Sequence, residues 1–181
     1  MVIAESLTGK IESMFNLVVT SLKTGGKVIL FGNGGSAADA QHIAGELVGR
    51  FKLDRPALPA MALTANTSIL TAMANDCGYN TVFSRQVEAL VTGKDVVIGI
   101  STSGASPNVI EALAMAKAKG ARTIGLTGDQ GSRMTEVTDL VIAVPSDDTP
   151  RIQEAHITIG HIVCELVERE LVNTGWFSAR E

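Results

Sequence analysis

One segment of the sequence indicates the architecture of this chain: Lys27-Val-Ile-Leu-Phe-Gly-Asn-Gly-Gly-Ser36. Residues 27–31 form a short apolar run, which predicts a strand buried on both faces of a sheet. Residues 32–36 predict a turn, and residues 37–48 then have the spacing of a helix. A buried strand, a glycine turn and a helix in this order indicate an α/β protein with a parallel sheet.

The rest of the chain repeats this alternation of strands and helices. Apolar positions at helical spacing predict a first helix that starts at residue 3 and ends at Gly25 and Gly26. Further strands are predicted at residues 59–64, 95–100, 122–127 and 140–144, and further helices at 68–74, 83–91, 107–119 and 151–172. We therefore predict a single domain over residues 1–181, with an N-terminal helix (3–25), an α/β core (27–145) and a long C-terminal helix (151–172).

Composition excludes several classes of protein. The chain has 181 residues, a formal net charge of −4, 45% hydrophobic and only 4% aromatic residues. This apolar content excludes a disordered chain, and the slight acidity argues against nucleic acid as a partner. No apolar run reaches the length of a membrane span, the N-terminus lacks signal-peptide features, and Cys77 and Cys164 have no metal or redox spacing. We expect a cytoplasmic protein with no membrane partner.

The glycine turn satisfies the relaxed dinucleotide fingerprint G-x-G-x-x-A from Gly32 to Ala37. The fingerprint also needs an acidic residue at the end of the second strand, and Asp54 precedes that strand, so a nicotinamide cofactor is disfavoured. A simpler alternative is a tight turn with Ser36 as N-cap and Asp39 completing a capping box. Capping does not explain the glycines and Asn33, which indicate close approach of the backbone to a ligand.

A second unusual loop, Ser101-Thr-Ser-Gly-Ala-Ser-Pro107, follows the third predicted strand. Ser106 is placed as N-cap and Pro107 as the first residue of the next helix. The loop is either a hydroxyl-rich turn with a good cap or a cradle for a phosphate group. In the cradle, hydroxyls and backbone N–H groups at a helix N-terminus bind the phosphate without a lysine or arginine.

Two pairs of polar residues lie on predicted helix faces. His42 and Glu46 are four residues apart, and Gln153 and His161 are eight apart, so each pair shares a face; His156 should point elsewhere. A His–Glu pair at this spacing is usually a surface helix pair. If the two pairs converge, they offer zinc ligands or an acid/base pair for proton transfer.

Five motifs together resemble the sugar isomerase (SIS) domain family. They are Gly32-Asn-Gly-Gly-Ser36, Asn75-Asp76, Ile100-Ser-Thr-Ser-Gly104, Leu126-Thr-Gly128 and Arg151-Ile-Gln-Glu-x-His156. Within the family the resemblance is to the phosphoheptose isomerases, over residues 17–172. It implies a three-layer, flavodoxin-like α/β sandwich with a five-stranded parallel sheet. It also implies isomerisation of sedoheptulose 7-phosphate to D-glycero-D-manno-heptose 7-phosphate through an enediol, the first step of lipopolysaccharide heptose biosynthesis.

The resemblance also implies roles for particular residues. Glu46 and His161 correspond to the family's catalytic acid/base pair, and His42, Glu46, Gln153 and His161 to the ligands of one zinc ion per subunit. The family's members are homotetramers with sites at subunit interfaces. Substrate contacts are implied for Asn33, Gly34, Gly35, Ser36, Glu46, Asn75, Asp76, Ser101, Thr102, Ser103, Ser106 and Gln153.

The chain departs from the family pattern at two places. Family members usually carry a further helix ahead of the segment at which this sequence starts, and that helix contributes to the oligomer interface. Some members also have an aspartate directly before the Arg-Ile-Gln-Glu motif, where this chain has Thr149-Pro150.

Two alternative functions stay open at this level. One is a non-catalytic SIS-domain regulator that binds a replication-initiator protein, although the presence of His42, Glu46 and His161 favours an enzyme. The other is an isomerase of a different sugar phosphate, because the loops recognise phosphate and hydroxyl groups and not the length of the sugar.

Overall fold

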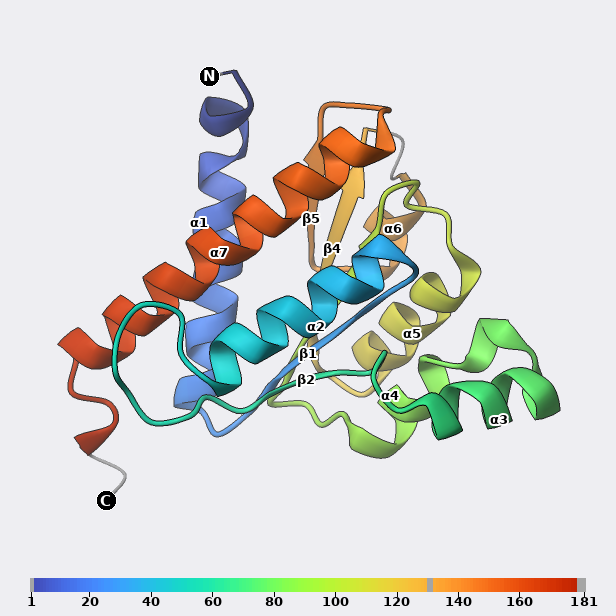
Figure 1. Cartoon of the computed structure of the whole chain (residues 1–181), viewed down its shortest axis with the longest axis horizontal. Coiled ribbons are helices and arrows are strands. Elements are labelled where there is room, and N and C mark those ends of the chain that lie inside the picture. The colour runs from blue at the N-terminus through green and yellow to red at the C-terminus, as the bar shows by residue number, and fades with distance from the viewer. Residues whose placement is uncertain (1, 130–131, 179–181) are drawn as a thin grey trace.

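The chain folds as a three-layer α/β sandwich (Figure 1). A computed structural model describes residues 2–129 and 132–178, with side chains at 7–129 and 133–178. The strands are β1 (Val28–Gly32), β2 (Ala60–Ala62), β3 (Val96–Ser101), β4 (Arg122–Gly128) and β5 (Leu140–Val144). The helices are α1 (Val2–Lys23), α2 (Gly35–Val48), α3 (Thr67–Cys77), α4 (Ser84–Leu90), α5 (Pro107–Ala118), α6 (Ser132–Val137) and α7 (Thr149–Asn173), with a 3-10 turn, η1 (Tyr79–Thr81), ahead of α4.

The sheet has five parallel strands in the order β2-β1-β3-β4-β5, which confirms the predicted fold class. In the centre, β1 pairs with β3 from Val28 opposite Val96 to Gly32 opposite Ile100. This is the flavodoxin-like order, in which the direction of winding reverses between β1 and β3. Ligands of such sheets bind at the carboxyl ends of the strands at this switch point. The loops after β1 and β3 are therefore the first place to look for a site.

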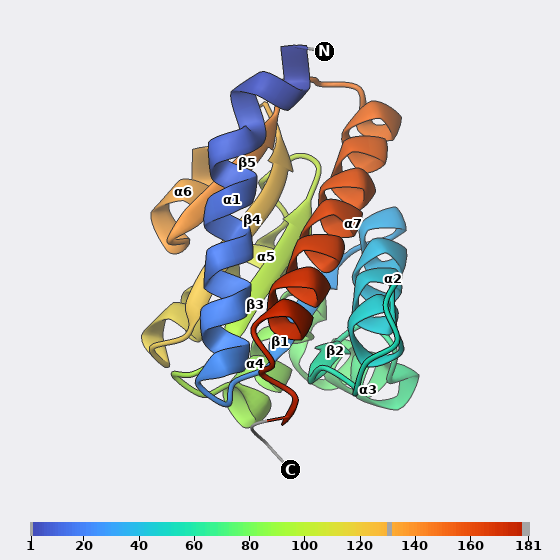
Figure 2. The same cartoon turned by 90° about the vertical axis from the view of Figure 1, so that its left-hand side faces the viewer.

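Helices cover both faces of the sheet because the apolar side chains of each central strand alternate. Along β1, Val28 and Leu30 belong to the core cluster that includes residues of α1, α2 and α7, whereas Ile29 and Phe31 belong to the cluster that includes residues of α4, α5 and α6. Figure 2 shows α1, α7 and α2 side by side over one face of the sheet. Within this layer α7 contacts both neighbours, so it is the central helix.

The start of α2 differs from the prediction. The helix begins at Gly35, so Ser36 lies inside its first turn and is not the N-cap. The N-cap is Gly34, whose φ of 57° lies in the left-handed region that glycine adopts without a Cβ clash. The predicted capping box of Ser36 and Asp39 is therefore wrong, because glycine geometry and not a serine side chain ends the turn.

Two other elements differ from the prediction. α3 extends to Cys77, so Asn75 and Asp76 lie inside the helix and not after it. Its end is hard to predict because Asn75 and Asp76 are exposed polar residues, which are also typical of a turn after a helix. α6 is missing from the sequence prediction because six residues are too few to show a helical period. None of the helices in the described ranges is long and apolar enough to cross a membrane.

One buried histidine makes the folding stability depend on pH. His156 of α7 is fully buried, and its Nε2 lies 3.1 Å from the carbonyl oxygen of Thr127 on β4, away from His161 as predicted. Burial lowers the pKa of the His156 imidazole, and the hydrogen bond to Thr127 only partly offsets this. The folded chain therefore keeps His156 neutral at pH values at which the unfolded chain protonates it, with an ordinary pKa of about 6.5.

We expect His156→Gln, which keeps a donor for the Thr127 carbonyl but does not titrate, to flatten the pH dependence of stability. In the wild type, keeping His156 neutral costs no folding stability above about pH 6.5. As the pH falls below that value, the unfolded state binds more protons than the folded state, so the free energy of unfolding decreases. Thermal melts between about pH 7.5 and about pH 5.5 measure the effect. Equal losses of Tm in the variant and the wild type would contradict it.

Candidate active site

The loop after β3 gathers hydroxyl groups at the start of α5. Ser106 is the N-cap of α5 and Pro107 stands in the first turn, as predicted. The Ser106 side chain does not cap the helix; its Oγ lies 2.9 Å from the Oγ of Ser101. Ser103 Oγ accepts a hydrogen bond of 3.3 Å from the backbone N–H of Ala105. The loop thus places neutral polar groups at the positive end of a helix, which suits an anion.

A small cavity lies beside this loop, with a volume of about 80 Å³. That volume accommodates two or three water molecules or one group of similar size. We call the residues that line it the cradle: Asn33, Ser36, Ile100, Ser101, Thr102, Ser106 and Gln153. All except Ile100 are predicted substrate contacts, which the fold brings together from the turn after β1, the loop after β3 and α7. A neighbouring hollow of about 190 Å³ includes the predicted contact Ser103.

The glycine turn lets α7 approach the cradle. A Cβ at Gly35 would collide with the side-chain amide of Gln153, so a larger residue there would displace α7 or the glutamine. The glycines predict a close approach of the backbone to a ligand. A close approach is present at Gly35, and the group that approaches is the Gln153 side chain of the same chain.

Asn33 is held by a residue that the sequence analysis missed. The side-chain amides of Asn33 and Asn108 form two reciprocal hydrogen bonds of 2.9 Å, and the Tyr79 hydroxyl donates to Asn33 Oδ1 at 3.2 Å. Asn108 is 2% exposed and joins the start of α5 to the turn after β1. Nothing in the sequence marks it, because asparagine in the first turn of a helix is ordinary.

The predicted histidines and glutamate converge at a second point, between α2 and α7. The Nε2 atoms of His42 and His161 are 2.9 Å apart, and His42 Nε2 lies 3.1 Å from Glu46 Oε1. The side chains of His42 and Glu46 are 49% and 24% exposed, so solvent and ligands reach them. We call His42, Glu46 and His161 the His/Glu cluster. The prediction that the two pairs of polar residues meet is confirmed for these three.

The cluster forms because α2 and α7 pack very closely beside it. A Cβ at Gly160 would lie 2.5 Å from Ile43 Cδ1 and 2.8 Å from Ile43 Cγ1, so a larger residue there would require the Ile43 side chain or one of the helices to shift. Gly160 directly precedes His161, and Ile43 directly follows His42. The tight contact between the two buried residues therefore brings the two imidazoles within reach of each other.

The donor atoms of the cluster suit a transition-metal ion. One ligand atom from each of the three residues lies within 4.8 Å of the others, and two imidazole nitrogens with a carboxylate oxygen are donors that zinc takes. Gln153 stands about 12 Å before His161 along α7, with its amide against Gly35. The structure therefore brings three of the four predicted ligands together and places Gln153 in the cradle. Cys164 is no rival ligand, because burial raises the pKa of its thiol to about 12.

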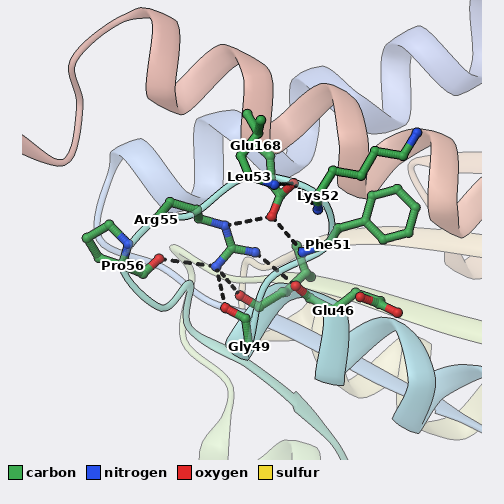
Figure 3. A network of polar contacts seen from close by, with 9 residues as sticks. Glu46, Gly49, Phe51, Lys52, Leu53, Arg55, Pro56 and Glu168 are labelled. Carbon is green, nitrogen blue, oxygen red and sulfur yellow. Dashed lines mark hydrogen bonds and ion pairs between the residues drawn. The ribbon is translucent and has the colours of Figure 1, made fainter.

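A buried ion pair lies between the end of α2 and α7 (Figure 3). The Arg55 Nε donates to Glu168 Oε1 at 3.0 Å, and both side chains are 1% exposed. Burial alone raises the pKa of the Glu168 carboxyl, but hydrogen bonds from the backbone N–H groups of Lys52, Phe51 and Leu53 and the charge of Arg55 outweigh it, so the pKa lies below its ordinary value. Sequence analysis missed this pair, whose members are far apart in the chain.

Two predicted substrate contacts lie elsewhere in this chain. Asn75 and Asp76 stand on α3, where they are exposed and hydrogen-bond to each other at 2.7 Å, and neither lines the cradle. Arg151, at the start of α7, pairs with Glu154 at 2.8 Å on its own helix.

These features together define the class of protein. A parallel sheet, a hydroxyl-lined cradle at its switch point and a His/Glu cluster between α2 and α7 are the features that the sequence motifs imply. The model of the SIS domain family matches residues 2–128. The chain therefore belongs to the SIS domain family, as its motifs indicate.

Particular relatives are more informative than the family. The chain is 60% identical over 169 residues to a phosphoheptose isomerase of Citrifermentans bemidjiense, a match that covers 93% of this chain and 88% of the relative. It superposes on a phosphoheptose isomerase of Neisseria gonorrhoeae with a TM-score of 0.85 and 44% identity, over 91% and 89% of the two chains. A phosphoheptose isomerase of Francisella tularensis gives 0.85 and 36%, over 89% and 86%.

Proposed function

We propose that this chain is a phosphoheptose isomerase, which interconverts sedoheptulose 7-phosphate and D-glycero-D-manno-heptose 7-phosphate, the first step towards lipopolysaccharide heptose. The observation that carries the proposal is the position of two sites along one pair of helices. Gln153 of α7 lies in the cradle beside the start of α2, and His161 of α7 meets His42 and Glu46 further along α2. An aldose–ketose isomerase needs such a pair of sites, one for the phosphate and one for the carbonyl end.

The spacing of the two sites supports a long sugar. Gln153 and His161 are about 12 Å apart along α7. With bonds of about 1.5 Å, an extended seven-carbon chain and its terminal phosphate span about 10 Å. This length is compatible with a heptose whose phosphate lies in the cradle and whose C1 and C2 lie near the His/Glu cluster.

The chemistry is a proton transfer between C1 and C2. The hydroxyls of Ser101, Thr102 and Ser106 and the N-terminus of α5 bind the phosphate, which fixes the far end of the open sugar. Glu46 removes the proton from one carbon to form the enediol and returns it to the other. His161 moves the hydroxyl proton, so that carbonyl and hydroxyl exchange places.

We expect Glu46→Gln to lower turnover of sedoheptulose 7-phosphate by about 10²–10⁴-fold, because the amide cannot accept the carbon-bound proton. The matched control is Glu165→Gln on α7, whose carboxylate pairs with Lys52 outside the cluster. Near-normal turnover by Glu46→Gln would sink this assignment. Exchange of the C1 and C2 protons with D₂O separates the two roles: loss of exchange in His161→Gln but not in Glu46→Gln would reverse them.

The proposal includes a zinc ion held by His42, Glu46 and His161, with Gln153 as the fourth ligand after its amide turns from the cradle. When bound, zinc polarises the carbonyl and hydroxyl oxygens of the sugar. We expect calorimetric titration to give one zinc ion per chain, and His42→Gln to weaken binding at least about tenfold. His156→Gln, which changes a histidine outside the cluster, is the control. Equal zinc affinity in the two variants would contradict the assignment.

We also propose a homotetramer in the cytoplasm, with sites at subunit interfaces. Apolar side chains that a monomer would bury are exposed on α7, where Ile162 and Leu166 line a groove with α1, and on α3 and α4 at Ile69 and Leu90. We expect light scattering to give four times the mass of one chain. A monomeric mass at micromolar concentration would contradict the proposal, as would recovery of the protein outside the cytoplasmic fraction.

A non-catalytic regulator is not favoured. A binding module has no need to bring His42, Glu46 and His161 together. In this chain His42 Nε2 lies within hydrogen-bond distance of both His161 Nε2 and Glu46 Oε1. The relatives described above, from 36% to 60% identical, are all phosphoheptose isomerases.

A further inference from the structure

We propose that Phe51, held by the buried pair of Arg55 and Glu168, is a positioning residue that orients His161. The inference rests on the proposed function, because the orientation matters only if His161 works in the His/Glu cluster. Among the described residues, Phe51, Arg55 and Glu168 belong neither to the lining of the cradle nor to the ligands of the cluster. They act through His161 and through the end of α2.

Arg55 fixes the end of α2, the helix that carries Glu46. Its guanidinium donates to the carbonyl oxygens of Glu46 and Leu47 at 2.8 Å and of Gly49 at 3.2 Å. The last carbonyls of a helix have no partner within the helix, so these bonds close the final turn of α2. Figure 3 shows the guanidinium lying between this turn and Glu168 of α7. The Arg55 guanidinium therefore links the end of α2 to Glu168 on α7.

Glu168 fixes the segment that leaves α2. Its carboxylate accepts hydrogen bonds from three successive backbone N–H groups, those of Phe51 at 2.7 Å, Lys52 at 2.8 Å and Leu53 at 3.1 Å. These three adjacent hydrogen bonds to one buried carboxylate fix the backbone of residues 51–53 against α7. The backbone position of Phe51 is thus set by a residue of the same helix that carries His161.

The Phe51 ring then stacks on the His161 imidazole. The two ring centroids are 5.2 Å apart and the planes are inclined by 23°. His161 lies seven residues, two helical turns, before Glu168, so both stand on the face of α7 that looks toward this segment. Contact with one face of the imidazole restricts its rotation and keeps Nε2 directed at His42, 2.9 Å away.

Phe51→Leu tests the inference, because it removes the ring but keeps the backbone N–H that Glu168 holds. The matched control is Phe177→Leu, which removes another half-buried ring of the same core, in contact with Trp176 and not with a histidine. Phe51→Tyr, which keeps the stacking, is the rescue variant. Direct substitution of Arg55 or Glu168 is a poorer test, because removing one partner of a buried ion pair can unfold the chain.

Three measurements are compared across the variants: imidazole ¹⁵N–¹H correlation spectra of the metal-free protein, the dissociation constant of Zn²⁺, and steady-state kinetics with sedoheptulose 7-phosphate. We expect Phe51→Leu to shift the His161 resonances, to raise the Zn²⁺ dissociation constant about tenfold and to lower kcat about tenfold at an unchanged KM. Phe177→Leu and Phe51→Tyr should match the wild type in all three.

The inference is overturned if Phe51→Leu and Phe177→Leu change the His161 resonances and Zn²⁺ affinity equally, since Phe51 is then only part of the core. Its failure is distinct from failure of the proposed function. If Glu46→Gln retains turnover, the proposed function fails, whereas the imidazole spectra of the metal-free Phe51 variants still report whether the ring orients His161.

Discussion

The contact between Gly160 of α7 and Ile43 of α2 is the constraint on which the candidate site depends. A Cβ at Gly160 would lie 2.5 Å from Ile43 Cδ1, so glycine at position 160 lets Ile43 pack directly on the backbone of α7. The neighbours of these two residues in the chain, His161 and His42, then meet at 2.9 Å. The same packing carries the start of α7 past the glycine turn, where Gln153 enters the cradle.

The buried pair of Arg55 and Glu168 complements this contact with polar interactions. Removing two charges from water costs about as much as their attraction returns, so the pair is not an obvious source of stability. Its charges are, however, saturated by backbone groups: carbonyls at the end of α2 on one side and three N–H groups of residues 51–53 on the other. Those groups would otherwise be buried without partners, which costs about 1–3 kcal/mol each. The pair thus contributes little net stability, but it fixes the positions of the end of α2 and of residues 51–53 relative to α7.

The sequence predicts those parts of the molecule that depend on local pattern. The alternation of apolar runs and helical spacing predicts the parallel sheet, and the interval from His42 to Glu46 predicts a shared helix face. Contacts between distant segments leave no such signal. Arg55 and Glu168 are 113 residues apart, and neither stands in a motif. Asn108 reads as an ordinary first-turn residue, and the N-cap of α2 is assigned to Ser36 because a serine side chain is visible in the sequence whereas the φ of Gly34 is not.

The cradle and the His/Glu cluster differ in the chemistry of their side chains, and they stand at different points along α2 and α7. The cradle is lined by neutral hydroxyl and amide groups beside a helix N-terminus, so it contributes no titratable charge. The cluster consists of two imidazoles and a carboxylate. The order of the two sites is set by a single continuous helix, α7, which carries both Gln153 and His161, and not by any one side chain.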